Sequence, residues 1–345
     1  MSARAWCTSD AADPGFEAAW ESAVRRLPYG HFGFRLDVLR WLHHLGSPSL
    51  AVLVEEPGWT GAIVARREEG AWVSGLPWRW NAAVAAEGRD PEHHLTRDEA
   101  HALFRQLEHF ADGRRVRAHL PETPNAGVAA FQAGRTLIHR IDVDDDALLK
   151  AMDKTKRSMI KRAQREGYRV VEATDPQQFR AFAVVQRDTD RRHGREPLDT
   201  EASEPEFGER WREWELPWMW LLVAEREGEV GSGFGLAHGA GRIIESRAAA
   251  STEAALRSGA FVLLAFEAAR RARERGYRYL NWGGDTFFKR DLTRGLSSHV
   301  PLHCWLGGGV RWQLANRGEV LVHAARGRAV ELLHALRSAT GRRSA

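Results

Sequence analysis

An ordered run of strands and one long helix in the second half of the chain constrains the fold most. Three apolar segments follow one another with short turns between them, at residues 220–225, 229–236 and 242–248. Residues 253–275 then have helical periodicity and end in several arginines before Gly276, which is typical of a helix C-terminus. Residues 277–282 form a further strand that ends in Gly283-Gly284. Strands and helices in this order predict an α/β fold.

The first half of the chain has the same two kinds of pattern. Apolar or alternating segments predict strands at residues 50–54, 61–66, 135–143 and 168–172. Residues 98–111 have apolar residues at helical spacing and are followed by Gly113. Together with the second half, these segments predict mixed sheets layered by helices. Ligands of such sheets bind at strand ends and at helix N-termini.

Residues 149–165 predict an amphipathic helix that follows the three capping carboxylates Asp144, Asp145 and Asp146. Its apolar face carries Leu149, Met152, Ile160 and Ala163. Nearly opposite lie the basic residues Lys150, Lys154, Arg157, Lys161 and Arg165. A run of charge is usually a solvated helix face. A surface that contacts phosphates is the other interpretation, because few acidic residues offset the positive charge here.

Length and composition limit the class of protein. A chain of 345 residues fits two domains, and 43% hydrophobic with 28% charged residues is typical of a globular protein. No apolar stretch approaches the ~20 residues of a membrane span. Residues 1–16 lack the basic start and apolar core of a signal peptide. We therefore expect a cytoplasmic protein without a membrane span.

Metal-binding patterns are weak in this sequence. Cys7 and Cys304 are too few for a disulfide framework or a cysteine-rich zinc site, and no HExxH spacing occurs. We expect no metal and no bound cofactor. Lys and Arg number 50 against 46 Asp and Glu, and most of the basic residues are arginines, which suit phosphate and carboxylate partners.

Several motifs in a fixed order resemble a known group of enzymes. They are Lys154-Thr155-Lys156-Arg157-Ser158-Met159-Ile160-Lys161-Arg162-Ala163, then Arg191-Arg192-His193-Gly194-Arg195, residues 259–276, Tyr279-Leu280-Asn281-Trp282-Gly283-Gly284 and Phe288-Lys289. This set resembles the FemABX aminoacyltransferases and the related acyltransferases of the Gcn5-like N-acetyltransferase (GNAT) superfamily. The resemblance covers about the C-terminal 190 residues.

The resemblance implies two GNAT-like domains in tandem. Residues 1–145 would form a degenerate first domain, and residues 146–325 would form the catalytic domain. Residues 326–345 would return as a helix to pack on the first domain. No internal repeat is visible in the sequence, so the duplication follows from the resemblance alone.

The family chemistry is amide formation, in which an amine attacks an acyl group carried as an ester on tRNA or as a thioester on coenzyme A. The resemblance implies Lys289, Glu245 and His193 as catalytic residues. The implied substrate-binding residues are Arg192, Arg195, Trp282, Gly283, Gly284, Asp285 and Trp80. The implied ligands of the donor phosphates or tRNA are Lys154, Arg157, Lys161, Arg165, Arg257, Gly259 and Arg290. We expect the Phe287-Phe288 pair to fix the Lys289 backbone where a strand ends.

Two departures from the family pattern bear on the donor and the acceptor. Arg257-Ser258-Gly259-Ala260 is one residue short of the usual pyrophosphate loop of acetyl-CoA enzymes. Phe288-Lys289 is followed by Arg290-Asp291-Leu292 rather than by the Gly-Phe common in cell-wall enzymes. The shortened loop favours aminoacyl-tRNA over acyl-CoA, and the second departure favours a small molecule or peptide as acceptor.

Three functional hypotheses follow. The first is an aminoacyl-tRNA-dependent transferase that joins an amino acid to the amine of a small molecule or peptide. The second is an acyl-CoA-dependent N-acyltransferase on the same fold. The third is a non-catalytic module that binds RNA or a metabolite. In each case we expect a monomer or a weak dimer.

Overall fold

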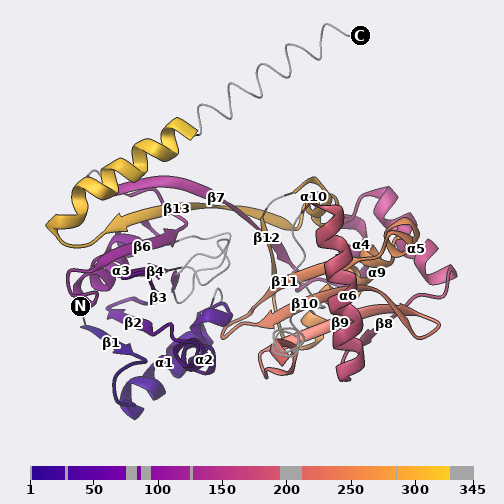
Figure 1. Ribbon diagram of the computed structural model, residues 1–345, viewed down its shortest axis with the longest axis horizontal. Coiled ribbons are helices and arrows are strands. Elements are labelled where there is room, and N and C mark those ends of the chain that lie inside the picture. The colour runs from indigo at the N-terminus through magenta and orange to yellow at the C-terminus, as the bar shows by residue number, and fades with distance from the viewer. Residues whose placement is uncertain are drawn as a thin grey trace, which may run out of the picture.

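A computed structural model describes most of the chain in atomic detail. The described residues are 2–27, 30–74, 84–86, 95–124, 127–194, 212–284 and 286–326. Two lobes lie side by side, one built mainly from the first half of the sequence and the other from the second (Figure 1). We call them the N-lobe and the C-lobe. None of the helices in the described part is both long and apolar enough to cross a bilayer.

One mixed sheet runs through both lobes. Within the described residues it has 13 strands, in the order β1-β2-β3-β4-β6-β13-β7-β12-β11-β10-β9-β8, with β5 beside β3. Its N-lobe strands are β1 (Ser2–Cys7), β2 (Ser49–Glu56), β3 (Trp59–Glu68), β4 (Ala71–Ser74), β5 (Val84–Ala86) and β6 (Arg115–Leu120). Its C-lobe strands are β8 (Arg169–Glu172), β9 (Met219–Arg226), β10 (Glu229–His238), β11 (Ile243–Ser251) and β12 (Tyr279–Gly284).

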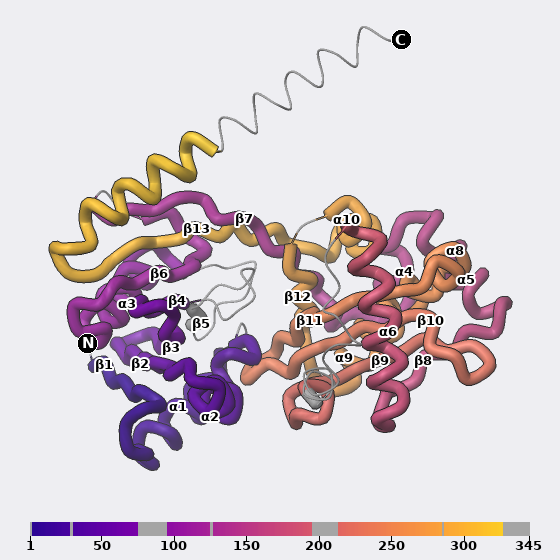
Figure 2. Tube along the Cα trace, in the orientation of Figure 1, coloured from indigo at the N-terminus to yellow at the C-terminus, as the bar shows by residue number. Residues whose placement is uncertain are grey.

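Two long strands, β7 (Ala129–Arg140) and β13 (Ser297–Gly307), join the lobes. They pair with each other in antiparallel fashion along most of their length. The second half of β13 also pairs with β6 of the N-lobe, whereas the second half of β7 pairs with β12 of the C-lobe. Figure 2 shows both strands crossing from one lobe to the other. The sheet is therefore continuous across the molecule.

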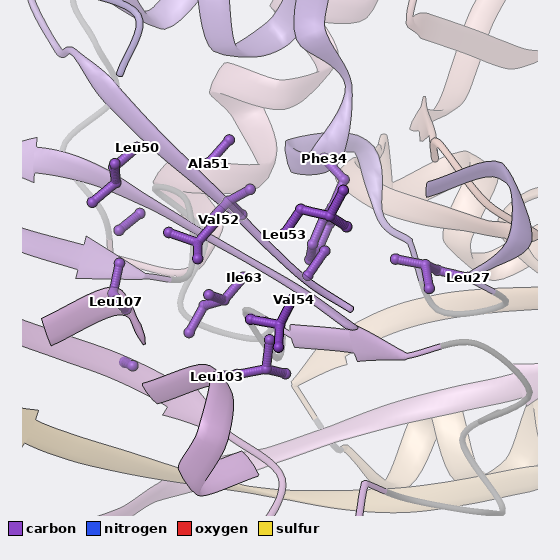
Figure 3. Close-up of a cluster of buried hydrophobic side chains, with 14 of the residues drawn as sticks. Leu27, Phe34, Leu50, Ala51, Val52, Leu53, Val54, Ile63, Leu103 and Leu107 are labelled. Atoms are coloured by element: carbon purple, nitrogen blue, oxygen red, sulfur yellow. The ribbon is translucent and has the colours of Figure 1, made fainter. Parts of the chain in front are cut away.

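Helices of the N-lobe cover a large apolar core. They are α1 (Pro14–Arg26), the 3-10 turn η1 (Phe32–Phe34), α2 (Leu36–His44) and α3 (Arg97–Phe110). Thr96 and Glu99 form a capping box at the start of α3. Figure 3 shows Leu103 and Leu107 of α3 beside apolar side chains of β2 and β3. Successive side chains of β2 point to opposite faces of the sheet, and both faces are buried.

The C-lobe sheet has helices on both faces. Those among the described residues are α4 (Asp145–Ala151), α5 (Lys154–Arg165), α6 (Pro176–Arg192), α8 (Glu253–Ser258), α9 (Ala260–Glu274) and α10 (Phe287–Thr293). The 3-10 turns are η2 (Arg212–Glu215) before β9 and η3 (Val310–Trp312) after β13. Helix α9 is almost fully buried against one face, and α6 covers the other through Phe179, Phe182 and Val185.

Two helices expected from the sequence are interrupted, so those predictions were wrong in their boundaries. The helix expected at 149–165 breaks at Met152, because Asp153 adopts an extended conformation and caps the new helix α5 through Thr155 N. The helix expected at 253–275 breaks at Gly259, which has a left-handed φ of 85° and separates α8 from α9.

The chain returns to the N-lobe after β13. Residues 313–326 are helical and lie over the N-lobe (Figure 1). Arg115 and Arg117 of β6 bind Glu319 of this helix at 2.5 and 2.8 Å, and Asn316 accepts from Arg115 Nε at 2.8 Å. The C-terminal helix predicted for residues 326–345 falls almost wholly outside the described residues.

A second apolar cluster holds the lobes together. Phe32, Val38 and Leu42 of the N-lobe pack with Trp218 and Met219 of the C-lobe. In addition, the β10–β11 turn lies against the chain that follows α1, where Gly241 N donates to Gly30 O at 2.7 Å. A Cβ at residue 241 would lie 2.0 Å from Leu27 O, so the two backbones meet at a distance that only glycine permits.

Candidate active site

A cavity opens where β11 and β12 separate. The two strands run parallel but pair only at Ile243–Tyr279, Ile244–Leu280 and Glu245–Asn281. Beyond these pairs both strands are irregular: the register of β11 shifts against β10, and that of β12 shifts against β7. The separated strand ends border a cavity of about 460 Å³. It is lined by Phe234, Glu245, Ser246, Arg247, Ala248, Ala249, Phe261, Asn281, Trp282, Gly283, Gly284, Phe288 and Lys289.

The cavity has walls of different polarity on the two faces of the sheet. Ile243 and Tyr279 belong to the N-lobe core, whereas Ile244 and Leu280 belong to the C-lobe core around α9. Because side chains alternate along a strand, Glu245 and Asn281 share the face of Ile243 and Tyr279. The cavity therefore has a polar wall toward the N-lobe and an apolar wall toward α9.

The apolar wall is aromatic. Trp282 stacks on Phe234 with ring centroids 5.1 Å apart, and Phe261 meets Phe234 edge-on at 5.7 Å. Phe288 packs against Phe261, and the ammonium of Lys156 lies over the Phe288 ring, 4.3 Å from its centroid. Such a wall suits an apolar or flat ligand group.

Asn281 and Thr136 shape the end of β12. Asn281 Oδ1 accepts from Thr136 Oγ1 at 2.6 Å and from Gly283 N at 2.8 Å. Gly283 has a φ of 71°, which lets the chain turn there without a side-chain clash. The strand therefore ends in a fixed turn whose carbonyl groups point away from the regular ladder.

Lys289 holds this turn from α10. Its Nζ donates to Trp282 O at 2.7 Å and to Gly284 O at 2.9 Å. The residue lies in the first turn of α10, where Thr286 Oγ1 accepts from Lys289 N at 3.4 Å. The Phe287-Phe288 pair was expected to fix the Lys289 backbone where a strand ends. In the structure the three residues begin the short helix α10 just after β12, and only Phe288 of the pair packs into the wall.

Glu245 and Arg247 form the charged part of the polar wall. Glu245 is 2% exposed, and the bulge leaves Arg247 as the extra residue between Ser246 and Ala248. The Arg247 guanidinium carbon lies 4.6 Å from the centroid of the Phe32 ring. Burial lowers the pKa of this guanidinium to about 9, although the carboxylates of Glu213 and Glu245 act in the opposite direction. Arg247 therefore remains charged at neutral pH.

The loop that would hold a donor pyrophosphate is closed by protein. A Cβ at Gly259 would lie 2.6 Å from Met159 Cβ and 2.8 Å from Met159 O, so α5 packs directly on this turn. The amide of Gly259 donates back into α8, and that of Ala260 is directed to Ser258 Oγ at 3.4 Å. The turn at Gly259 therefore packs against α5, and these two amides are directed within the chain.

The predicted donor-binding residues lie on or near α5, but they differ in their surroundings. Lys161 and Arg165 line an open surface hollow of about 660 Å³, and Lys154 is exposed on the same helix. Arg157 instead donates to Leu149 O, Lys150 O and Met152 O at the end of α4. Arg257 is exposed near Glu253, and Arg290 lies over the exposed Phe287 ring.

Among the described residues, His193 and Arg192 do not line the cavity. His193 caps the end of α6 and is exposed. Arg192 donates from the same helix end to Thr189 Oγ1 at 2.9 Å and to Ser251 O, at the far end of β11. Trp80, Arg195 and Asp285 lie outside the described residues. Five predicted residues do meet at the cavity: Glu245, Trp282, Gly283, Gly284 and Lys289.

Sequence reasoning missed Arg247, Asn281 and Thr136. Asn281 is a polar residue inside the apolar strand β12, and Arg247 interrupts a run of small residues in β11, which is the sequence signal that marks these two. Thr136 lies among other polar residues of β7, so the sequence does not mark it. The aromatic residues Phe234 and Phe261 gave no such signal, since apolar residues in a strand and a helix are expected in any core. Within the described residues, no cluster of three or more His, Cys, Asp or Glu could hold a metal ion.

No protein-family model and no curated protein sequence matches the chain. Among solved structures, FemX superposes with a TM-score of 0.62 at 13% identity, over 92% of this chain and 100% of FemX. The fold is that of FemX. This likeness confirms the predicted α/β class with tandem GNAT-like domains and, at the level of fold, the resemblance to the FemABX group.

Two further solved structures have lower TM-scores. The C-terminal domain of a lysylphosphatidylglycerol synthetase from Agrobacterium fabrum has a TM-score of 0.45 at 14% identity, over 74% of this chain and 83% of that domain. A tandem GNAT protein from the clavulanic acid biosynthesis pathway has a TM-score of 0.42 at 13% identity, over 88% of this chain and 97% of its own.

Proposed function

We propose that the protein is an acyltransferase of the GNAT superfamily that forms an amide. In this proposal it moves an amino acid from aminoacyl-tRNA to the amine of a small molecule or peptide. The cavity between β11 and β12 carries the proposal, because it brings Lys289, Glu245 and the Gly283-Gly284 turn together in a FemX-like fold.

The proposed step needs few groups. The acceptor ammonium first loses one proton, which Glu245 receives in this proposal. The amine nitrogen then attacks the acyl carbon, which forms a C–N bond and puts negative charge on the carbonyl oxygen. The Lys289 ammonium on the cavity wall stabilises that charge. When the ester C–O bond breaks, the second amine proton goes to the ribose oxygen that leaves on the tRNA.

Two observations support tRNA as the carrier. The exposed basic residues Lys154, Lys161 and Arg165 lie together on α5 and could contact a phosphate backbone. The turn at Gly259, where acetyl-CoA enzymes hold pyrophosphate, is filled by Met159 and has its amides directed within the chain. Both argue for a donor held along α5 rather than at the start of α9.

Purified protein tests the donor directly. It would be incubated with a pool of tRNA charged with radioactive amino acids and with a mixture of amines, in parallel with radioactive acetyl-CoA and longer acyl-CoA donors. We expect label in an alkali-stable product from charged tRNA, abolished when the tRNA is digested beforehand with RNase.

Two results would contradict the proposal. Product from acyl-CoA with none from charged tRNA would assign the acyl-CoA-dependent reaction instead. Binding of tRNA with no transfer from either donor, unchanged in Lys289→Ala, would indicate a non-catalytic module.

A further inference from the structure

The polar wall of the cavity presents an anion and a cation on one strand face. Glu245 lies at the last residue pair before β11 and β12 separate, and Arg247 lies two residues farther along β11. Both face the N-lobe, opposite the aromatic wall. A ligand on this side of the sheet therefore meets a carboxylate and a guanidinium at neighbouring positions.

A β-bulge and one N-lobe residue fix the position of the Arg247 side chain. The β-bulge redirects its side chain, because Leu236 pairs with Ser246 and Gly235 pairs with Ala248. Phe32 of η1 supports one face of the guanidinium at 4.6 Å. The planar guanidinium has five N–H donors, so it can serve Glu245 and a ligand together. A lysine in its place would offer a single point of charge.

Charge complementarity indicates the ligand. The amine that attacks in the proposed function is an ammonium before it reacts, and Glu245 is the carboxylate beside the reacting end of the cavity. A carboxylate next to that amine would face Arg247, which binds carboxylates in a bidentate manner. Glu245 is 2% exposed, and a charged contact with a buried group is stronger than one at the surface.

We propose that the acceptor is a free α-amino acid, with its carboxylate bound by Arg247 and its amine beside Glu245. This inference rests on the proposed function and narrows its acceptor from any amine to one class. Arg247 is then a substrate-binding residue that sets specificity, and the product is a dipeptide.

Matched acceptors test the proposal. Charged tRNA would be offered with the twenty standard amino acids or with the corresponding amino-acid carboxamides, which have the same side chains and amine but no carboxylate. The amine of a carboxamide is less basic and thus more often uncharged at neutral pH, so without recognition the carboxamides should react faster. We expect the free acids to be favoured instead, by about 10- to 100-fold in kcat/KM.

Variants test whether Arg247 causes the preference for free acids over carboxamides. We expect Arg247→Met to raise KM for the free acid to that of the carboxamide while KM for the carboxamide stays the same. Arg247→Met could fail to fold, because it removes a positive charge near the buried Glu245. Arg247→Lys keeps that charge and should retain part of the preference for free acids over carboxamides. Arg226→Met removes an arginine that lies over Tyr168, away from the cavity, and should change neither KM.

Each other outcome overturns the inference. Equal or better use of carboxamides, or transfer only to amines without a carboxylate, would exclude an α-amino acid acceptor and leave the tRNA-dependent reaction standing. Absence of product with every acceptor would also exclude it. In that case the affinities for charged and uncharged tRNA, measured in the same samples, decide whether the proposed function fails too: equal affinities would count against it.

Discussion

At the scale of single residues, one lysine both holds the turn at the end of β12 and lines the cavity. Lys289 binds two carbonyl groups of the β12 turn and lines the cavity with its ammonium. Its place in the first turn of α10 lets the Lys289 side chain reach the end of β12, while Phe288 before it packs into the aromatic wall.

Replacing Lys289 tests that task. We expect Lys289→Met to lower kcat by about 10²- to 10³-fold, because one preorganised positive charge near the developing oxyanion is lost. The rate of product formation from charged tRNA measures it. Arg25→Met, which removes an exposed positive charge on α1 of the N-lobe, is the control and should retain the wild-type rate. Equal rates for the two variants would remove Lys289 from the mechanism.

A buried histidine predicts how stability responds to pH. His139 on β7 is 1% exposed, and neither ring nitrogen has a hydrogen-bond partner among the described residues. Burial lowers its pKa from 6.5 to about 3. The unfolded chain therefore binds a proton below pH 6.5 that the folded protein does not bind, so stability is fully present above that pH and falls as the pH decreases toward 3.

The size of this effect is measurable by urea unfolding. Between about pH 7.5 and about pH 5, His139 should cost about 2 kcal/mol of the free energy of unfolding. We expect His139→Leu to lose less stability than the wild type over this interval, by that amount. The same pH dependence in both proteins would mean that the imidazole is not held neutral by burial.

At the scale of elements, Arg157 and Lys161 lie on the same helix, α5, but have different surroundings. Arg157 satisfies carbonyl groups that α4 leaves open at its C-terminus, whereas Lys161 lines a surface hollow. The sequence shows both as members of one basic stripe.

We expect Arg157→Ala to lower the free energy of unfolding by about 1–2 kcal/mol, because carbonyl groups of α4 lose their donor. Lys161→Ala should leave stability within about 0.5 kcal/mol, because its side chain is exposed. The same change should weaken tRNA binding and reduce its salt dependence by about one ion. Thermal unfolding and tRNA titrations at two salt concentrations measure both. Normal tRNA binding by Lys161→Ala would move the donor away from α5.

Regular patterns made much of the C-lobe predictable. The three strands before α8, the strand β12 and the position of Glu245 on the third strand all follow from apolar runs and turn residues. The breaks at Met152 and Gly259 did not, because a single glycine or aspartate is compatible with a continuous helix until tertiary packing decides. The bulge at Arg247 also depends on pairing across strands, which one strand's sequence does not contain.

At the scale of the whole molecule, close backbone contact fixes the lobes relative to each other. The turn at Gly241 touches Leu27 and Gly30, and Phe32 of the same N-lobe segment supports Arg247. The polar wall of the cavity thus depends on how the lobes are placed. This explains why the N-lobe, which contributes no residue to the lining within the described part, still bears on the site.

We expect Gly241→Val to lower the melting temperature by several degrees and to reduce transfer activity, because a side chain there would push the two backbones apart. Calorimetry and the transfer assay measure the two effects. Gly318→Ala, in the helix of residues 313–326, is the control, since a Cβ there meets nothing within 4 Å and alanine favours helix. If Gly241→Val melted like the control, the lobes would not depend on this contact.

The exchange of strands between the lobes has a consequence for synthesis of the protein. Strand β6 pairs with β13, which lies at Ser297–Gly307, nearly 200 residues later in the chain. As a ribosome makes the protein, the lobe that emerges first keeps an open strand edge throughout translation of the second lobe. The first lobe can therefore complete its folding only when β13 has been made, after most of the chain exists. Until then, the open edge of β6 is exposed to pairing with a wrong strand.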